Sequence, residues 1–227
     1  MKQIAVAIDG PSGAGKSTIA RAVAAELGFI YVDTGALYRT IGLAACRADV
    51  AGDDAQAVSA LLPGLQLELR YMGGAQHVLL NGEDVSDAIR TSEIARYASL
   101  VSAIPAVRGY LLDLQRDMAR HHSVIMDGRD IGTVVLPDAE VKIFLTASAE
   151  TRAERRWREL RGKGQDVALD EVLEQLNTRD AKDEGRETAP LRQADDAILL
   201  DTSGLDLPQS VAAVRGLIDA RLAGNNP

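Results

Sequence analysis

A glycine-rich stretch between an apolar run and a helical pattern constrains the fold of this chain more than any other feature. The stretch reads GPSGAGKST, residues 10–18, and it follows the apolar run Ile4–Ile8. It fits the pattern G-x-x-x-x-G-K-[ST], whose fixed positions are here Gly10, Gly15, Lys16 and Ser17. Glycines let the backbone turn so tightly that successive N–H groups point at one anion, and a helix that begins near Lys16 adds the positive end of its dipole. A strand, this loop and a helix in that order therefore predict a binding site for a nucleoside triphosphate.

Every residue of this loop is expected to contribute to triphosphate binding. The expected ATP-binding residues are Gly10, Pro11, Ser12, Gly13, Ala14, Gly15, Lys16, Ser17 and Thr18. The Lys16 ammonium would reach the β- and γ-phosphates, and the Ser17 hydroxyl would ligate Mg²⁺. The alternative is a glycine-rich turn that matches the pattern by chance, which four fixed residues in a strand–loop–helix context disfavour.

Short apolar runs alternate with amphipathic stretches along the chain. The runs that read as buried strands are Ile4–Ile8, Phe29–Val32, Val124–Met126, Val141–Leu145 and Ala197–Leu200. The helical stretches lie at about residues 18–29, 92–120, 149–161, 168–184 and 208–222. Strands that are buried on both faces and separated by helices predict an α/β, P-loop NTPase-type three-layer fold with a central five-stranded parallel sheet. Ligands of such sheets collect at the carboxyl ends of the strands, where Asp9, Asp127 and Thr146 follow three of the runs.

One segment departs from this alternation. Between Leu65 and Asp87 the sequence alternates apolar and polar residues, with turn signals at Gly73-Gly74 and Asn81-Gly82. This pattern predicts a small antiparallel hairpin region, inserted at roughly residues 63–90. A chain of 227 residues can bury one core with an insertion, so we expect a single domain over residues 1–227.

The composition narrows the range of partners. The net charge is −8, from 33 acidic and 25 basic residues, which argues against a broad surface for nucleic acid or anionic membranes. The single cysteine, Cys46, allows no intramolecular disulfide and suits a reducing compartment. No apolar run approaches the length of a membrane span. We expect a cytoplasmic protein and, because no long apolar surface stripe demands a partner, a monomer.

A second block, DTGALYR at residues 33–39, directly follows the second apolar run. A strand that delivers Thr34 and Gly35, followed by a helix that carries Arg39, would make a second anion-binding corner. The alternative is a helix N-cap at Asp33 or Thr34 followed by a surface arginine, and the block alone does not decide between them.

A third block, DGRDIGTVV at residues 127–135, follows the run that ends in SVIM. Asp127 takes the position of a Walker-B acid, close to the phosphates, and would reach Mg²⁺ through a water molecule. Arg129 and Asp130 then lie in a loop at the ligand edge, where an arginine can bind a phosphate and a carboxylate can bind a base edge. The alternative is a solvated turn with a chance ion pair.

A fourth block prolongs the apolar stripe of a helix. The stripe is formed by Leu169, Val172, Leu173 and Leu176, and its continuation by Arg179, Asp180, Asp183 and Arg186. Charges that continue a buried stripe are expected to face a wet cleft or a ligand, because burying them unpaired is costly. The alternative is a helix end that leaves the core, with ordinary i,i+4 ion pairs.

An arginine-rich helical arm precedes that helix. Its five arginines are Arg152, Arg155, Arg156, Arg158 and Arg161, and it ends at Gly162-Lys163-Gly164. A basic arm hinged by glycines is typical of a lid that closes over polyphosphate. We therefore expect a helical lid at about residues 151–166, although the sequence does not single out one of these arginines as catalytic.

Taken together, GPSGAGKST, DTGALYR, DGRDIGTVV and RDAKDEGR resemble the bacterial cytidylate kinases of the nucleoside monophosphate kinase superfamily. The resemblance covers nearly the whole chain, including the inserted LNGEDVSDAIRT. It implies transfer of the γ-phosphoryl group of ATP to CMP or dCMP, giving ADP and CDP or dCDP, in pyrimidine metabolism. It also implies that the insertion, about residues 34–108, binds the acceptor nucleotide.

The resemblance further implies individual roles in the acceptor site. Arg39, Arg129 and Arg186 would hold the acceptor phosphate, Ser99, Arg108 and Asp130 would face the cytosine, and Arg179 and Asp183 would meet the sugar hydroxyls. Lys16, Arg129 and Arg186 would be the catalytic residues. Thr34 stands where many relatives have serine, which keeps a hydroxyl, and Ala181 and Lys182 vary within a motif whose ends are intact.

Two other functions remain as alternatives. One is a different P-loop small-molecule kinase, of the adenylate or shikimate type, which the hairpin insertion and DGRDIGTVV disfavour. The other is a nucleotide-dependent switch. The N-K-x-D motif with which GTPases usually recognise guanine is absent from the chain, and a switch has no use for an acceptor arginine cluster.

Overall fold

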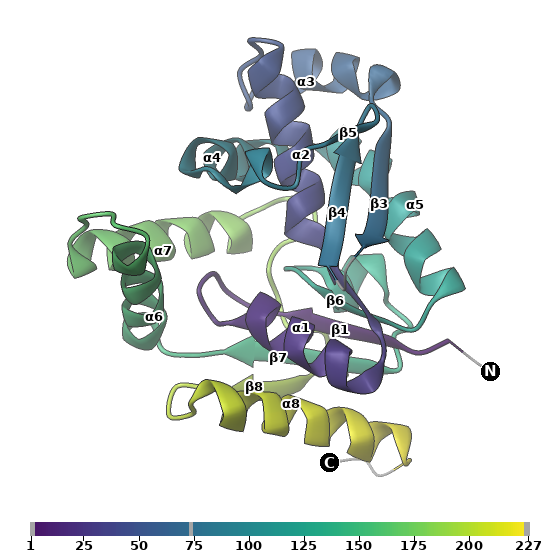
Figure 1. Ribbon diagram of the computed structural model, residues 1–227, viewed down its shortest axis with the longest axis vertical. Coiled ribbons are helices and arrows are strands. Elements are labelled where there is room, and N and C mark those ends of the chain that lie inside the picture. Colours follow the sequence, from purple (N-terminus) through teal and green to yellow (C-terminus); the bar gives the residue numbers. More distant parts are fainter. Residues whose placement is uncertain (1–2, 73–74, 225–227) are drawn as a thin grey trace. The chain divides into compact units, whose positions relative to one another are not determined.

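The chain divides into two compact units in a computed structural model that describes residues 3–72 and 75–224 (Figure 1). The first unit comprises the residues up to Tyr31 together with those from Ala119 onward, and the second comprises Val32–Met118. The second unit contains the whole of the expected insertion at about residues 34–108. Within the described ranges, no helix has both the length and the apolar character needed to cross a membrane.

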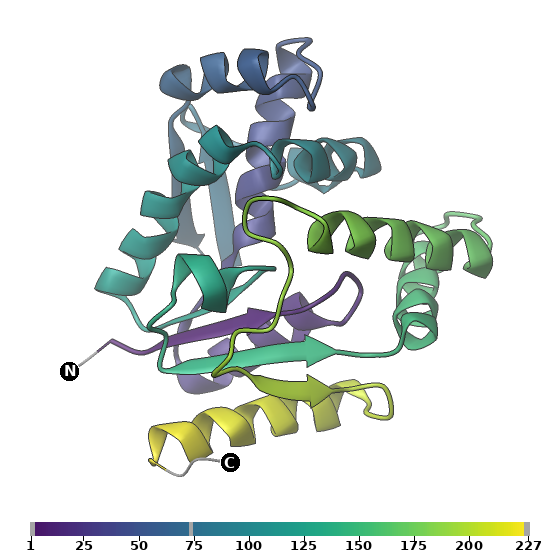
Figure 2. The same cartoon turned by 180° about the vertical axis from the view of Figure 1, so that it is seen from behind.

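The first unit is built on a five-stranded sheet. Its strands are β1 (Ala5–Asp9), β2 (Ile30–Asp33), β6 (Val124–Asp127), β7 (Val141–Thr146) and β8 (Ile198–Asp201), and the unit boundary runs through β2. The spatial order is β2-β6-β1-β7-β8, and β1 pairs in parallel with both of its neighbours, as β7 does with β8. Figure 2 shows β7 between β1 and β8. The predicted central five-stranded sheet is confirmed, and the carboxyl ends of β1 and β6 bring Asp9 and Asp127 to one edge.

Helices α1 (Lys16–Leu27) and α8 (Leu207–Leu222) cover one face of this sheet (Figure 1). Their apolar side chains form one core with the strands, which includes Ile8, Ile19, Val23, Ile143, Val214 and Ile218. Helix α1 ends two residues before the predicted position 29. Gly28 adopts a left-handed conformation with φ of 68°, and its N–H group caps the carbonyls of the last turn.

Helices α6 (Ala149–Gly162) and α7 (Leu169–Glu184) form a hairpin in the region expected to be a lid. Ala153 and Leu160 of α6 pack against Val172 and Leu176 of α7 in a small core of their own. Helix α6 ends at the predicted Gly-Lys-Gly segment, where Gly164 has a φ of 76°. Leu169, which we expected in the buried stripe, is the first residue of α7 and is 38% exposed, and it is not part of this small core.

The second unit combines helices with a small antiparallel sheet. Its elements are α2 (Thr34–Arg47), α3 (Ala55–Leu61), the 3₁₀ turn η1 (Leu62–Gly64), β3 (Leu67–Met72), β4 (Ala75–Leu80), β5 (Glu83–Asp84), the 3₁₀ turn η2 (Ala88–Arg90), α4 (Ser92–Val101) and most of α5 (Pro105–His121). The strands pair in the order β3-β4-β5, so the predicted hairpin region is confirmed.

The two predicted turns of this small sheet have different outcomes. At the second, Asn81 and Gly82 have φ values of 51° and 84°, which is the conformation of a two-residue hairpin turn between β4 and β5. The first, at Gly73-Gly74, lies outside the described residues.

The single helix predicted over residues 92–120 is wrong. The structure has two helices there, because α4 ends at Val101 and α5 begins at Pro105. Proline has no N–H group to continue a helix and disfavours helical geometry in the residue before it, whereas its fixed φ suits the first turn of a new helix.

Two helical glycines of the second unit yield opposite predictions. A Cβ atom at Gly42 of α2 would lie 2.9 Å from Cβ of Tyr97 and 3.0 Å from the backbone nitrogen of Ala98, both in α4. Gly109 of α5 has no such neighbour within 4 Å. We expect Gly42→Ala to lower the free energy of unfolding by about 1–3 kcal/mol through overpacking, and Gly109→Ala to raise it by about 0.5–1 kcal/mol through lower chain entropy. Urea unfolding measures both, and equal midpoints would contradict the close α2–α4 packing.

Candidate active site

Two glycines of the loop after β1 are required by the backbone. Gly10 has a φ of 144°, and a Cβ atom there would lie 2.0 Å from the carbonyl oxygen of Leu145. Gly13 has a φ of 76°, and its Cβ would lie 3.3 Å from Cβ of Arg152. The backbone at these two positions therefore disfavours any side chain, and α1 begins at Lys16 as predicted.

Lys16 is buried inside this loop. Its Nζ donates a hydrogen bond of 2.7 Å to the carbonyl oxygen of Pro11. Burial lowers the pKa of Lys16 well below its ordinary value, and the nearby charge of Arg129 lowers it further. An anion that enters the loop would favour the charged ammonium, because it supplies the counter-charge that burial removes.

Ser17 and Asp127 lie side by side below the loop. The Ser17 hydroxyl donates to Oδ2 of Asp127 at 2.7 Å, and the Tyr31 hydroxyl donates to Oδ1 at 2.8 Å. A hydroxyl and a carboxylate are the hard oxygen donors that Mg²⁺ prefers, so the residues present fit this ion. The structure thus brings the two predicted metal-binding residues together. The sequence analysis missed Tyr31, which orients Asp127 from the neighbouring strand β2.

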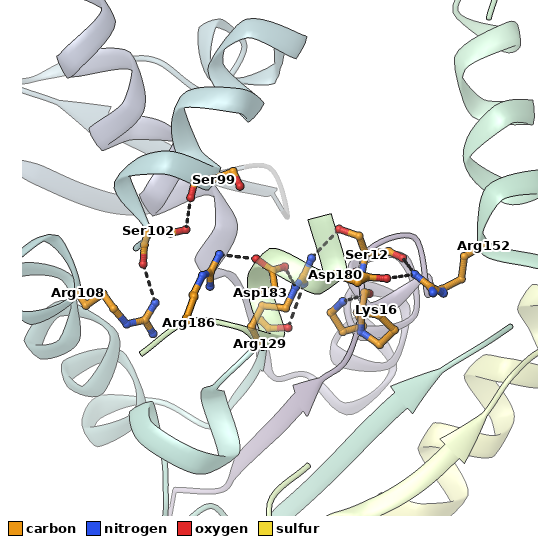
Figure 3. Close-up of polar contacts among 12 residues, drawn as sticks. Ser12, Lys16, Ser99, Ser102, Arg108, Arg129, Arg152, Asp180, Asp183 and Arg186 are labelled. Carbon is orange, nitrogen blue, oxygen red and sulfur yellow. Dashed lines mark hydrogen bonds and ion pairs between the residues drawn. The ribbon is translucent and has the colours of Figure 1, made fainter. Parts of the chain in front are cut away.

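An acidic side chain joins two of the predicted phosphate-binding arginines (Figure 3). Asp183 accepts a hydrogen bond of 2.7 Å from Nε of Arg129 and another from Nη2 of Arg186. Arg129 also donates to the hydroxyl of Ser12 at 2.8 Å, which links the cluster to the glycine-rich loop. Burial on its own raises the pKa of Asp183, but the charges of Arg129 and Arg186 outweigh burial and hold the pKa below its ordinary range. Asp183 is therefore a carboxylate at neutral pH.

A second buried ion pair, between Arg152 and Asp180, holds the backbone of the glycine-rich loop. Asp180 accepts a hydrogen bond of 2.9 Å from the backbone N–H of Ser12 and a further one from Nη1 of Arg152. The same guanidinium donates to the carbonyl oxygens of Ser12, at 2.8 Å, and Ala147, at 3.0 Å. The sequence placed Asp180 on the stripe and Arg152 in the arm but assigned neither a role. The helical periodicity of the sequence predicts their positions on the helices, but it does not predict that both bind the backbone of Ser12.

The other arginines of the arm bond elsewhere. Arg155 donates to the carbonyl oxygens of Thr202 and Leu205, while Arg156 and Arg158 pair with glutamates of their own helix at the surface. Arg161 lies over the Trp157 ring, 5.1 Å from its centroid. Of the five, Arg152 is the one that contacts the glycine-rich loop in the described structure.

Asp9 connects β1 to the loop that carries Arg129 and Asp130. Its carboxylate accepts hydrogen bonds from the backbone N–H groups of Ile131, at 2.8 Å, and Gly132, at 2.7 Å. These groups begin η3 (Ile131–Val135), a π-helical turn whose preceding residue Asp130 is buried and makes no side-chain cap. Asp9 therefore caps the turn in place of Asp130. Asp9 was expected at the ligand edge, but its bonds to Ile131 and Gly132 were not.

In the second unit, Asp33 binds two groups at the start of α2. Its Oδ1 accepts from the backbone N–H of Ala36 at 2.9 Å, and its Oδ2 pairs with Nη2 of Arg39 at 2.9 Å. Among the buried side-chain nitrogen and oxygen atoms of the described residues, Nε of Arg39 and Oγ1 of Thr133 have no hydrogen-bond partner. The N-cap alternative for Asp33 is thus correct, and it coexists with an arginine held at the same corner. The predicted ligand Thr34 is buried beside it.

Two further predicted residues of this unit meet around Ser102 (Figure 3). The Ser102 hydroxyl donates to the carbonyl oxygen of Ser99 at 3.0 Å, and Nη1 of Arg108 donates to the carbonyl oxygen of Ser102 at 3.1 Å. Arg108 also lies over the Tyr38 ring, 5.6 Å from its centroid. Ser99 and Arg108 are therefore brought together through Ser102, and Arg108 contacts Tyr38, which precedes Arg39 in the sequence.

The predicted common helical face of Arg179, Asp183 and Arg186 needs correction. Helix α7 ends at Glu184, so Arg186 lies beyond it, after Gly185, whose N–H group caps the helix on the carbonyl oxygen of Ala181. Arg186 nevertheless pairs with Asp183, three residues earlier in the sequence. Arg179 is exposed, whereas Asp180 and Asp183 continue the buried stripe as expected.

The buried carboxyl of Asp9 makes folding stability depend on pH. Burial raises its pKa from 3.8 to about 6, against the two backbone hydrogen bonds, with Asp130 adding to the rise and Lys16 opposing it. A raised carboxyl pKa stabilises the folded state below about pH 4, and that contribution is lost as the pH rises through 6. Relative to Asp9→Asn, the wild type should lose about 2 kcal/mol between pH 4 and pH 7. Urea unfolding across this window, with the exposed Asp53→Asn as control, tests this, and a constant difference would contradict it.

Comparisons with known proteins agree with this geometry. The family model described as cytidylate kinase matches residues 6–219. The cytidylate kinase of Syntrophotalea carbinolica is 51% identical over 208 residues, 92% of this chain and 88% of the relative, and that of Geobacter sulfurreducens is 50% identical over 216 residues, 95% and 93% of the two chains. A solved structure of an uncharacterized protein from Eubacterium ventriosum, 13% identical, shares the fold alone, with a TM-score of 0.55 over 96% of this chain and 99% of that one. The chain belongs to the cytidylate kinase family.

Proposed function

We propose that this protein transfers the γ-phosphoryl group of ATP to CMP or dCMP, forming ADP and CDP or dCDP, in pyrimidine nucleotide metabolism. Family membership over nearly the whole chain supports this function. The observation that carries it is the bond from Ser12 of the phosphate-binding loop to Arg129, which Asp183 pairs with Arg186. A loop for one phosphate group joined to an arginine pair for another is what transfer between two phosphates requires.

The donor half of the site is assigned to residues 10–18. Their backbone N–H groups would surround the β-phosphate, and Lys16 would move from the Pro11 carbonyl to the β- and γ-phosphates. Ser17 and, through a water molecule, Asp127 would hold Mg²⁺ with the bound ATP. The ion supplies charge neutralisation on the triphosphate when it is bound.

The acceptor half of the site is assigned to nine residues. By similarity to the family, Arg39, Arg129 and Arg186 hold the monophosphate, Ser99, Arg108 and Asp130 recognise the base, and Arg179 and Asp183 bind the sugar, with Thr34 beside them. The ion pairs of Arg129 and Arg186 with Asp183 support this assignment, because they hold the two guanidinium groups ready for an anion.

The chemistry needs no general base. The second pKa of a phosphate monoester is near 6, so its oxygen already carries the attacking electron pair at neutral pH. What the chain must supply is in-line orientation and positive charge as the phosphoryl group moves. We assign this positive charge to Lys16, Arg129 and Arg186, none of which transfers a proton.

Base selection follows from the hydrogen-bonding edge of cytosine. Its N4 amino group is a donor, which a carboxylate such as Asp130 can accept, whereas uracil would present a carbonyl oxygen to the same group. Two facing acceptors leave a buried polar group unpaired, which penalises UMP strongly.

The proposal also covers the domain organisation, a lid, the oligomeric state and location, and the partners. The chain acts as a single nucleoside monophosphate kinase domain over residues 1–227, with the acceptor-binding insertion at about 34–108. A lid at about residues 151–166, which comprises most of α6 and the start of its connection to α7, closes on ATP, and the glycines at 162 and 164 support this role. The protein works as a monomer in the cytoplasm. Its single cysteine, which allows no intramolecular disulfide, suits that reducing compartment. Neither nucleic acid nor membrane is a partner.

A substrate panel tests the function directly. With ATP and Mg²⁺, CMP and dCMP should stimulate ADP release far above UMP, AMP and shikimate, because the proposed base and phosphate contacts fit only the first two. A coupled ADP-release assay measures this. Greater activity with AMP or shikimate would favour another small-molecule kinase, and slow hydrolysis that no monophosphate stimulates would favour a nucleotide-dependent switch.

Replacing Lys16 separates catalysis from folding. Lys16→Met should lower kcat about 10²–10³-fold, because it removes positive charge from the moving phosphoryl group while methionine keeps the apolar stem. Steady-state kinetics with CMP measure the loss, and circular dichroism checks the fold. Arg215→Met, which removes a cation from α8, is the control. Turnover near that of the wild type in Lys16→Met would refute the assigned role.

A further inference from the structure

One side chain of the inserted sheet binds the corner from which the acceptor helix starts. Gln76 of β4 accepts a hydrogen bond of 2.9 Å at Oε1 from the backbone N–H of Asp33, and its Nε2 lies 3.4 Å from the Asp33 carbonyl oxygen. The side-chain amide thus pairs with both polar groups of the Asp33 peptide, as a neighbouring strand would. Gln76 therefore binds the last residue of β2, directly before α2 begins.

Asp33 passes this constraint on to Arg39. Its two carboxylate oxygens are divided between the N–H group of Ala36, which fixes the first turn of α2, and Nη2 of Arg39. Gly35 leaves the necessary space, because a Cβ atom there would lie 3.2 Å from Oδ1 of Asp33 and 3.4 Å from Nη1 of Arg39. The backbone position of Asp33 therefore decides where the guanidinium lies.

The guanidinium of Arg39 retains an unused donor. Its Nε is buried and has no hydrogen-bond partner within the residues that the structure describes. A buried donor without a partner is costly, and native proteins rarely keep one unless a ligand or water completes it. A phosphate oxygen is the acceptor that best suits a guanidinium held in this way.

We propose that Gln76 is a positioning residue for the acceptor monophosphate. It holds the Asp33 peptide, Asp33 holds Arg39, and Arg39 binds the phosphate. This inference rests on the proposed function, and it gives the inserted antiparallel sheet a specific role in that function. Gln76 acts through Asp33 and Arg39 and touches neither the base nor the transferred phosphoryl group.

The first test compares two neighbouring residues of β4. Gln76→Ala should raise KM for CMP about three- to tenfold and change kcat and KM for ATP less than twofold, because only the acceptor arginine is released. His77→Ala is the matched control, since its side chain points to the other face of the strand and pairs with Asp84. An unchanged KM for CMP in Gln76→Ala, or an equal rise in His77→Ala, would overturn the proposal.

The second test asks whether Gln76 acts through Arg39. In an Arg39→Ala background, Gln76→Ala should change KM for CMP less than twofold further, because the residue that it positions is gone. Effects that multiply in the double variant would show that Gln76 acts independently and would overturn the proposal. If Gln76→Ala does not fold, Gln76→Met, which preserves volume and removes the amide, replaces it in both tests.

Different results would refute the proposed kinase function and the positioning role of Gln76. Absence of CMP-dependent ADP formation in the wild type would refute the proposed function. The Gln76, His77 and Arg39 variants are then assayed with the monophosphate that the wild type does accept, for which the same expected KM pattern supports the positioning role and its absence overturns it.

Discussion

The tight passage of the chain from β1 into α1 is the constraint on which the rest of the site depends. Gly10 approaches the backbone of β7 so closely that no side chain fits, and this brings the glycine-rich loop to the carboxyl edge of the sheet. Buried carboxylates then hold the loop and its surroundings. Asp180 holds the Ser12 peptide, Asp127 holds Ser17, and Asp183 holds Arg129, which reaches Ser12.

These carboxylates resolve an electrostatic conflict in the first unit. A site for two phosphate groups needs several cations, and cations gathered in a buried place repel one another and lose hydration. Asp183 between Arg129 and Arg186, and Asp180 beside Arg152, neutralise that charge and fix the guanidinium groups. Lys16 instead lies on a carbonyl oxygen with a lowered pKa. The site is thereby oriented before any anion arrives, which is what catalysis by positioning requires.

Local patterns predicted much of this and failed at identifiable points. The five strands, the helix after the loop and the Asn81-Gly82 turn follow from apolar periodicity and turn chemistry, which act between near neighbours. The helix over residues 92–120 was wrong because apolar periodicity continues across Pro105 while backbone hydrogen bonding does not. The contacts of Tyr31, Asp9 and Arg152 were missed because each binds a partner that is distant in the sequence, and periodicity carries no information about such partners.

The sequence by itself determined the class of fold, the loop for a triphosphate and the residue types available to an acceptor, because glycine conformations, apolar periods and motif spacing are local properties. Only the tertiary structure decided which carboxylate neutralises which cation. Asp180 meets a peptide 168 positions away, and Gln76 meets one 43 positions away, through folding of the intervening chain. The physical reason is that a buried charge or peptide group must find a partner in space, and several residues of the right type are equally suitable until packing brings one of them within hydrogen-bonding distance.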